Sequence, residues 1–487
     1  MCIMCFASFP LSTHAALKKT IRLNSTGPDV VFLQRFLIDE TYLNYQPAIL
    51  GVFGPRATRA LKEFQRLNGI EPTGIAGPIT RSYINNFSGS NATTSTQNIS
   101  NEKLTNAIEH AASLATLPVL VEFYTQPGDS EIAQVQSYGG IIKRTYHFVP
   151  VIAANIPTEK ILALSKEQNV KIIELDQNAF KRLDAATSSL PIINTTSTST
   201  IVVPQIIATS TSISVAVIDS GIDYTHPDLA PYYAGGYNFI NNTNDAMDDN
   251  NHGTHVAGII LTIFKQYIGN QAGVPNIKLF SLKVLDDKGS GYFSDIIAAL
   301  EWAVDHHMTI TNNSYGSNTD PGRIVLEAFN KADHAGVLSV AAAGNSGSCN
   351  SDTDTVEFPA RYPSVVAVAA FDTINKSRPC FSSTGEDVEI AAPGVSILST
   401  KRGGGYIQYS GTSMASPYVS GGAAVIFAKN SNKYKRINDA VRNILEQNSD
   451  DIGTPGRDLN FGFGIINIDR ALSFVKTAAA TPKMLNP

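Results

Sequence analysis

Four short stretches of the 487-residue chain carry side chains that could together perform acyl transfer. In GTSMASP, Ser413 lies among small residues, and Pro417 is best tolerated in the first turn of a helix. We therefore expect the free N–H groups of a helix start to surround Ser413. Such a start stabilises the negative charge that develops on an attacked carbonyl, so this serine could act as a nucleophile.

A nucleophilic serine needs a base, and the base needs a carboxylate to orient it. The run SVAVIDSGID places Asp219 at the end of an apolar, β-branched segment, which is typical of a buried parallel strand with a carboxylate at its C-terminal edge. NHGTHVAGII begins a helix with His252 in its first turn. VLSVAAAGN is a strand of small residues that ends at Asn345, whose amide can donate a hydrogen bond to an oxyanion.

In chain order, Asp219, His252, Asn345 and Ser413 resemble the site of the subtilisin-like serine proteases, a family known for the order aspartate, histidine, serine. The resemblance implies that Ser413 is the nucleophile and that His252 is the general base and then the general acid. It also implies that Asp219 orients the imidazole, and that Asn345 and the N–H of Ser413 form the oxyanion hole. The chain has no GxSxG nucleophile elbow, which disfavours a serine esterase.

Residues 204–477 alternate apolar strands with helices, which predicts an α/β fold with a doubly wound, mostly parallel sheet. The resemblance covers this whole range, including residues 395–400 and 462–467. It implies a subtilisin-like catalytic domain in which the ends of strands carry the site.

The family holds its substrate as an added β-strand between two edges, which implies endopeptidase action on extended protein or peptide chains with broad sequence tolerance. By matching motifs, the edge residues are Ser314, Tyr315, Gly316, Ala342, Ala343 and Gly344. Tyr315 replaces a small aliphatic residue and should narrow or roof the substrate pocket.

Glu357 stands where the family usually has glycine, at the base of the pocket for the side chain before the cut. A carboxylate there would pair with arginine or lysine, so we expect a preference for basic residues at that position. The alternative is that Glu357 turns outward and forms a surface ion pair.

The first module, residues 17–87, has apolar residues at helical spacing between glycine-rich turns, which predicts a small helical bundle. The pairs Leu33–Gln34 and Phe64–Gln65 and the turn GVFG resemble the peptidoglycan-binding domain type 1, which implies binding to cell-wall peptidoglycan. The alternative is a module for stability or dimerisation alone. The module lacks the paired carboxylates of a glycan hydrolase, so binding is favoured over cleavage.

The second module, residues 102–183, alternates strands and helices in a pattern that predicts an α+β, ferredoxin-like domain. It resembles the propeptide of subtilisin-like proteases. The resemblance implies a zymogen whose own propeptide assists folding and inhibits the enzyme until it is cut. The alternative is an unrelated ferredoxin-like domain.

Polar segments rich in Ser and Thr, residues 88–101 and 184–203, are expected to be linkers, and the maturation cut is expected in the second. Such a cut would separate the wall-binding module from the protease unless the released pro-region stays bound. Residues 1–15 resemble the remnant of a secretory signal peptide without its charged start, so we expect a secreted, extracellular or wall-associated protein. Residues 478–487 are expected to be a tail.

Cysteine usage agrees with export. Cys2 and Cys5 would leave with the signal, so Cys349 and Cys380 remain as a pair in predicted surface loops. Some secreted subtilisin-like enzymes join similar loops by a disulfide, and the resemblance therefore implies a Cys349–Cys380 bridge. The alternative is two free thiols.

No cofactor is expected for the chemistry. His255 lies three residues after His252, without the spacing or the glutamate of a hydrolytic zinc helix, so we interpret it as a packing residue. Family members often bind structural calcium, and the acid-rich residues 245–251 could supply oxygen ligands. Residues 264–275 depart from the family's usual calcium loop, so we expect calcium without assigning metal ligands.

Composition excludes some partners. The net charge of −5 comes from 37 basic and 42 acidic residues without a long block of either sign, so no nucleic acid partner is expected. Beyond the N-terminus no segment has the uninterrupted apolar length of a membrane span. Two function classes remain: an active secreted serine endopeptidase, or a catalytically inactive wall-binding scaffold, against which the intact triad argues.

Overall fold

The computed structural model describes residues 16–40, 42–43, 50–86, 102–110, 115–182, 212–269, 276–350, 353–430 and 437–480. The expected signal remnant (1–15) and the two expected linkers (88–101 and 184–203) lie outside these residues. The chain divides into two compact units, Met1–Ser95 and Thr96–Pro487, and each is described by itself.

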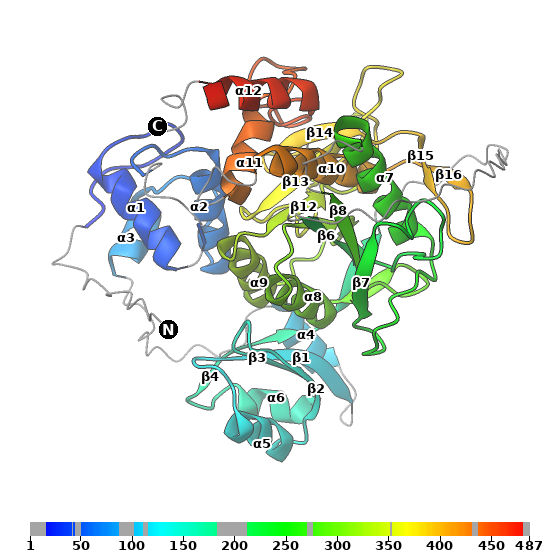
Figure 1. Cartoon of the computed structure of the whole chain (residues 1–487). Helices are drawn as coiled ribbons and strands as arrows, with labels where there is room; N and C mark the ends of the chain where they lie inside the picture. The colour runs from blue at the N-terminus through cyan, green and yellow to red at the C-terminus, as the bar shows by residue number, and fades with distance from the viewer. Residues whose placement is uncertain are drawn as a thin grey trace, which may run out of the picture. The chain divides into compact units, whose positions relative to one another are not determined.

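The first unit is the expected small helical bundle (Figure 1). Its helices are α1 (Pro28–Asp39), α2 (Pro55–Leu67) and α3 (Pro78–Asn85). Each helix begins with proline directly after a glycine, and proline suits this position because its missing N–H has no intrahelical acceptor there. Three Gly-Pro pairs therefore set the three helix starts.

Two buried glutamines hold the turns that follow α1 and α2. The side chain of Gln34 bonds the N–H of Gly51 (2.8 Å) and the carbonyl of Val52 (2.9 Å). Gln65 bonds the N–H of Gly74 (2.8 Å) and the carbonyl of Ile75 (2.9 Å) in the same way. These are the glutamines of the two pairs that carry the resemblance, and both act on the backbone of their own unit.

In the second unit, residues 102–182 form what we call the α+β region. Its elements are α4 (Glu102–His110), β1 (Thr116–Phe123), α5 (Asp129–Ser137), β2 (Ile141–Thr145), β3 (Val151–Pro157), α6 (Thr158–Leu164) and β4 (Val170–Leu175). The sheet order is β2-β3-β1-β4 with antiparallel neighbours. The βαββαβ sequence with this order is the expected ferredoxin-like arrangement.

A short strand continues beyond that sheet. β5 (Asn178–Arg182) pairs antiparallel with β11 (Tyr315–Gly316) on one side and with β9 (Ser290–Tyr292) on the other. Sequence reasoning did not predict β5, because five residues with little apolar alternation give no strand signal. The end of the α+β region therefore lies as the middle strand between two segments from much later in the chain.

Residues 212–480, which we call the parallel-sheet region, contain seven parallel strands in the order β14-β13-β12-β10-β6-β8-β7. They are β6 (Ile213–Asp219), β7 (Tyr233–Asn238), β8 (Ile277–Lys283), β10 (Ile310–Asn313), β12 (Leu338–Ala342), β13 (Val365–Phe371) and β14 (Ile390–Pro393). β6 lies between β8 and β10, and the strands that follow it in the sequence are added on both of its sides, so the direction of strand addition reverses at β6. In an open α/β sheet, ligands bind beyond the C-terminal ends of the strands at such a point.

Helices cover both faces of this sheet, as the doubly wound prediction requires (Figure 1). One face carries α7 (His252–Ile268), α10 (Thr412–Asn430), α11 (Ile437–Gln447) and α12 (Ile468–Ala480), and the other carries α8 (Phe293–Asp305) and α9 (Arg323–His334). The tail expected from residue 478 begins later, because α12 runs to Ala480 and only residues 481–487 lie outside the described part.

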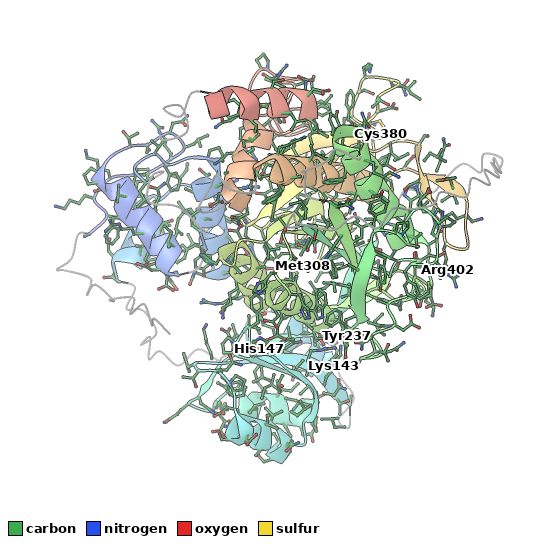
Figure 2. The ribbon with its side chains drawn as sticks, in the orientation of Figure 1. Lys143, His147, Tyr237, Met308, Cys380 and Arg402 are labelled. Carbon is green, nitrogen blue, oxygen red and sulfur yellow. A yellow bond between two sulfur atoms is a disulfide. The ribbon has the colours of Figure 1, made fainter. Side chains whose placement is uncertain are left out.

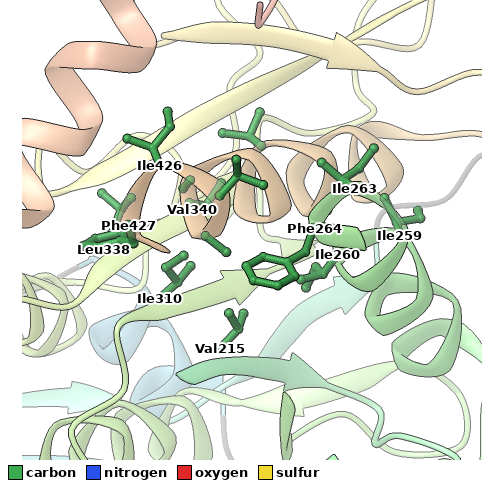
Figure 3. Packing of buried hydrophobic residues seen from close by; sticks show 14 of the residues in the cluster. Val215, Ile259, Ile260, Ile263, Phe264, Ile310, Leu338, Val340, Ile426 and Phe427 are labelled. Carbon is green, nitrogen blue, oxygen red and sulfur yellow. The ribbon is translucent and has the colours of Figure 1, made fainter. Parts of the chain in front are cut away.

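The main core lies between the sheet and helices α7 and α10. Figure 3 shows Val215, Ile310 and Val340 of the strands facing Phe264 of α7 and Ile426 of α10. The two helices also touch directly.

At Gly421 of α10, an added Cβ would lie 2.8 Å from Cβ of Ile263 in α7, so only glycine permits this approach. Because His252 begins α7 and Ser413 is near the start of α10, this contact limits how the two helices can move relative to each other.

A hairpin of β15 (Ile397–Thr400) and β16 (Tyr406–Tyr409) precedes α10. Within the described part of the chain, none of the helices has the length and apolar character needed to cross a bilayer.

Candidate active site

The carboxylate and the histidine meet beyond the C-terminal end of β6. Asp219 is the last residue of β6 and His252 is the first residue of α7. His252 Nδ1 lies 2.8 Å from Asp219 Oδ1 and 3.0 Å from Oδ2, and both side chains are fully buried. This bond makes Nδ1 the donor, so Nε2 is the ring nitrogen that can accept a proton.

Ser413 is the second residue of α10, and it is bonded to Ser314 in both directions. The hydroxyl of Ser413 donates to the carbonyl of Ser314 (2.8 Å), and the hydroxyl of Ser314 donates to the carbonyl of Ser413 (2.9 Å). The sequence suggested that Pro417 lies in the first turn of a helix. In the structure it lies inside α10, beyond the first turn. The helix tolerates it because the carbonyl that its missing N–H would have bonded, that of Ser413, accepts the Ser314 hydroxyl instead.

Asn345 is oriented by the residue before Ser413. Its Oδ1 accepts hydrogen bonds from the N–H (3.0 Å) and the hydroxyl (2.9 Å) of Thr412. The amide nitrogen Nδ2 is therefore turned the other way; it is buried and has no hydrogen-bond partner among the described residues. A buried donor without a partner is costly in a folded protein, and it is what an oxyanion hole requires.

One of the two expected substrate edges is already paired. The main chain of Tyr315 and Gly316 in β11 pairs with Arg182 and Lys181 of β5. Ser314, the residue directly before β11, is bonded to Ser413. An extended chain on this edge therefore runs directly toward the nucleophile.

The main chain of the other expected edge, Ala342 to Gly344, is bonded within the parallel-sheet region, and the role of these residues in binding substrate stays a prediction. Ala342 pairs with β13, and Ala343 bonds Val368 through its N–H and Glu357 through its carbonyl. The main-chain groups of Gly344 bond Thr412 and Ser383.

The strand that pairs with the far side of β5 is β9, Ser290–Tyr292. Sequence reasoning missed it, because three residues just before α8 show no alternation. The Ser-Gly pair there is typical of a turn, so no local signal identified the strand.

Tyr315 turns its ring into the protein. The side chain is fully buried, and its hydroxyl donates to Asn313 Oδ1 (2.8 Å). Burial, together with the charge of Asp219, raises the pKa of the phenol well above its usual value, so Tyr315 stays neutral. Its effect on the width of the pocket stays a prediction.

Glu357 is buried beside Asn345 and does not turn outward. Its Oε1 accepts hydrogen bonds from the N–H of Asn345 (3.2 Å) and the hydroxyl of Ser346 (2.8 Å), and 4% of the residue is exposed. Burial raises the pKa of this carboxyl above its usual value, against the effect of the two hydrogen bonds. A Cβ at Gly344 would lie 2.7 Å from Glu357 Cγ, so Gly344 is needed to admit the glutamate.

The expected bridge between Cys349 and Cys380 is present (Figure 2 labels Cys380). It joins the loop after Asn345 to the segment that follows β13. The same two segments are also linked by the hydrogen bond from the N–H of Gly347 to the carbonyl of Phe381 (2.9 Å). The disulfide therefore braces the loop that carries Asn345 and Ser346, the residue whose hydroxyl bonds Glu357.

The acid-rich segment 245–251 does not fit a calcium ion. Asp245 accepts from Tyr224, Asp249 pairs with Lys283 (2.6 Å), and Asp248 accepts from backbone and hydroxyl donors. Within the described ranges, no cluster of three or more acidic, histidine or cysteine side chains is arranged to hold a metal. The segment 264–275 is helical to Ile268, and residues 270–275 lie outside the described part.

His255 is a packing residue, as expected. Its Nε2 lies within hydrogen-bond distance of the carbonyls of Ile397 (3.1 Å) and Ile407 (3.0 Å) in the β15–β16 hairpin. Burial lowers the pKa of His255 to about 3, so the ring is neutral and donates from Nε2.

Comparison with known proteins covers most of the chain. The model of the subtilase family matches residues 210–464, and that of a peptidoglycan binding domain matches residues 26–84. Subtilisin E from Bacillus subtilis is 38% identical over 342 residues, which cover 69% of this chain and 84% of that protein. The minor extracellular protease Epr from the same organism is 34% identical over 369 residues, covering 74% of this chain and 55% of that protein.

One solved structure extends the comparison. Fervidolysin from Fervidobacterium pennivorans, described as a keratinolytic enzyme related to subtilisin, has a TM-score of 0.59 and 26% identity. The match covers 74% of this chain and 61% of fervidolysin. The resemblance predicted from the motifs is therefore found again in both sequence and structure.

Replacing Asn345 with alanine should lower kcat by about 10²–10³-fold, the loss known for removing one such donor from subtilisin. KM should stay nearly unchanged, because the donor acts on charge that develops only in the transition state. Steady-state hydrolysis of a chromogenic peptide measures both constants. Asn241→Ala, at an exposed loop position, is the matched control. An unchanged kcat would exclude Asn345 from the oxyanion hole.

Proposed function

Since the chain belongs to the subtilase family and is a serine endopeptidase, we propose that it is secreted as a zymogen and cuts peptide bonds through an acyl-enzyme on Ser413. His252 takes the proton of the Ser413 hydroxyl and later gives it to the leaving amine, while Asp219 stabilises the imidazolium. Asn345 Nδ2 and the N–H of Ser413 bind the oxyanion, and water releases the acyl group. The buried Asp219–His252 bond is the observation that carries this assignment. The chemistry uses no cofactor, and structural calcium remains a proposal without assigned ligands.

The α+β region acts as the inhibitor in this proposal. Its strand β5 occupies the position between β11 and β9 where an extended substrate would lie. Main-chain pairing on both sides does not depend on side-chain identity, so any other chain has to displace β5 to reach Ser413.

Two carboxylates of the same region support this inhibitory role, because they cap helices of the parallel-sheet region. Glu174 accepts from the N–H groups of Arg323 (2.8 Å) and Ile324 (3.0 Å) at the start of α9. Asp176 accepts from the N–H of Ser294 (2.9 Å) in the first turn of α8. Each supplies negative charge where a helix has unsatisfied donors.

Charges of opposite sign also meet at this boundary (Figure 2 labels Lys143). Asp295 of α8 pairs with Lys143 (3.4 Å) and Arg144 (3.2 Å) of β2, and it is almost fully buried. Buried charge pairs cost much more to break than exposed ones, so we expect the α+β region to stay bound after a cut.

The register of β5 also favours one maturation site. Arg182 is the last residue of β5 and pairs with Tyr315, so the strand ends one residue short of Ser314, the residue bonded to Ser413. We therefore propose that the cut falls between Leu183 and Asp184, at the start of the expected linker. Leu183 itself lies outside the described residues.

The secreted protein should yield a new N-terminus at Asp184, whereas Ser413→Ala should stay full length because no acyl-enzyme can form. Mass mapping of both purified proteins measures this. A mature chain beginning at Leu183, after the basic Arg182, would contradict the register. Cleavage of Ser413→Ala at the same rate would show that another protease makes the cut.

For substrate choice, we propose that Glu357 favours arginine or lysine before the cut. Its burial beside Asn345 supports the proposal, because a carboxylate in a site with little water attracts a cation strongly. A leucine at the proposed maturation site is not in conflict, since that cut is intramolecular and needs little help from binding.

Glu357→Gln should lower kcat/KM for arginine peptides by about 10-fold or more and leave leucine peptides within about twofold, because a charge-assisted bond contributes roughly 1.5–3 kcal/mol. In the unmodified enzyme the ratio of arginine to leucine cleavage should fall as the pH falls through the raised pKa of Glu357, since the protonated carboxyl no longer attracts a cation. Matched peptides assayed across pH measure it. Equal cleavage of both peptides at every pH would reject the role.

For location, we propose that residues 17–87 bind peptidoglycan. The match to a peptidoglycan binding domain over residues 26–84 supports this. Because the proposed cut separates this module from residues 184–487, wall association would then persist only while the α+β region stays bound. The inactive scaffold remains the alternative function, and labelling of Ser413 by an organophosphonate would exclude it.

Full-length Ser413→Ala should sediment with insoluble peptidoglycan, and the same protein lacking residues 16–86 should stay in the supernatant. Sedimentation followed by gel analysis of both fractions measures this. Equal sedimentation of the two would assign wall association to another part of the chain, and no sedimentation of either would reject wall binding.

A further inference from the structure

We propose that Asp248 is a positioning residue. It fixes the loop after Asp219 against the first turn of α7, so that the ring of His252 meets the carboxylate of Asp219. The proposal rests on the assignment of Asp219 and His252 to catalysis. Asp248 contacts neither substrate nor the reacting atoms, and it acts through Ser220 and Thr254.

Five donors converge on this one carboxylate. Asp248 Oδ1 accepts from the hydroxyl of Ser220 and from the N–H groups of Asn250 and Asn251, each at 2.9 Å. Its Oδ2 accepts from the N–H (2.9 Å) and the hydroxyl (2.5 Å) of Thr254. Asp248 is fully buried, so these bonds replace all of its contact with water.

The donors come from the two segments that carry the catalytic pair. Ser220 follows Asp219 directly, and its N–H donates to Asp219 Oδ1 (2.7 Å). The Ser220 hydroxyl also accepts from the N–H of Gly253, the residue after His252 (3.0 Å). Asp248 therefore joins Ser220, the residue after Asp219, to Thr254, which lies two residues after His252 in the first turn of α7.

Close backbone packing makes this junction rigid. A Cβ at Gly221 would lie 2.7 Å from the Cα of Asp248, and a Cβ at Gly253 would lie 2.1 Å from the carbonyl oxygen of Gly221. Glycine at both positions lets three backbone segments touch. Such packing leaves few alternative positions for His252 once the Asp248 bonds are made.

A carboxylate is the group that this site requires. An ionised carboxylate only accepts, whereas an asparagine would place two amide hydrogens where Thr254 already donates twice. Asp248→Asn should therefore keep the volume of the side chain but loosen the Thr254 half of the junction. Errors of about 1 Å in the placement of a catalytic group can lower a rate by about 100-fold.

The test compares Asp248→Asn with Asp372→Asn. Asp372 is also a buried aspartate that accepts from turn N–H groups, those of Ile374 (2.9 Å) and Asn375 (3.1 Å), but in a loop remote from Asp219 and His252. In the mature enzymes, Asp248→Asn should lower kcat by about 10–100-fold with KM within about twofold. Asp372→Asn should change neither constant.

Two further measurements keep the proposal falsifiable if Asp248→Asn matures poorly. The first is the rate of self-processing, an intramolecular cut that reports the chemical step directly, and it should fall by a similar factor. The second is the low-field proton resonance of His252 Nδ1–H in the Ser413→Ala background, which should move upfield or broaden when Asp248→Asn is added. A merely structural loss of stability would leave this resonance in place in the fraction that stays folded.

An unchanged kcat and an unchanged resonance in folded Asp248→Asn would overturn the proposal, and so would equal effects of Asp372→Asn. If instead the unmodified enzyme neither processes itself nor reacts with an organophosphonate at Ser413, the proposed function fails. These outcomes differ, so the two proposals can be rejected independently.

Discussion

The structure depends on a buried carboxylate that has to be satisfied at the point where the strand order of the parallel sheet reverses. Asp219 lies there at the end of β6, out of contact with water, and His252 is the side chain that satisfies it. A buried carboxylate without such a partner would be strongly disfavoured. The packing of α7 against α10 at Gly421 then limits the distance between the helix that begins with His252 and the one that carries Ser413.

Much of this arrangement could be predicted because its signals are local. The doubly wound sheet follows from apolar strands that alternate with helices. Asp219, His252 and Ser413 lie at the ends of such elements, and Asn345 lies in the loop that follows β12. Parallel strands bring their C-terminal ends to one edge of the sheet, so residues far apart in sequence could be expected to lie together.

The features that could not be predicted depend on contacts between distant segments. β5 becomes a strand only because β11 and β9 flank it, and five residues alone carry no such information. The main chain of Ala343 and Gly344 bonds segments that are distant in the sequence, so local patterns could not show these contacts. Pro417 lies further along its helix than its chemistry suggested, because Ser314 satisfies the carbonyl that the proline leaves unbonded.

The two buried glutamines of the helical unit play the same structural part. Gln34 in α1 and Gln65 in α2 each bond one N–H and one carbonyl of the turn that follows. Each turn is followed by a Gly-Pro helix start. The unit therefore uses one arrangement twice: a side chain in a helix holds a turn, and the turn is followed by the start of the next helix. Loss of either amide would leave an N–H and a carbonyl of a turn unpaired and would free the helix start that follows.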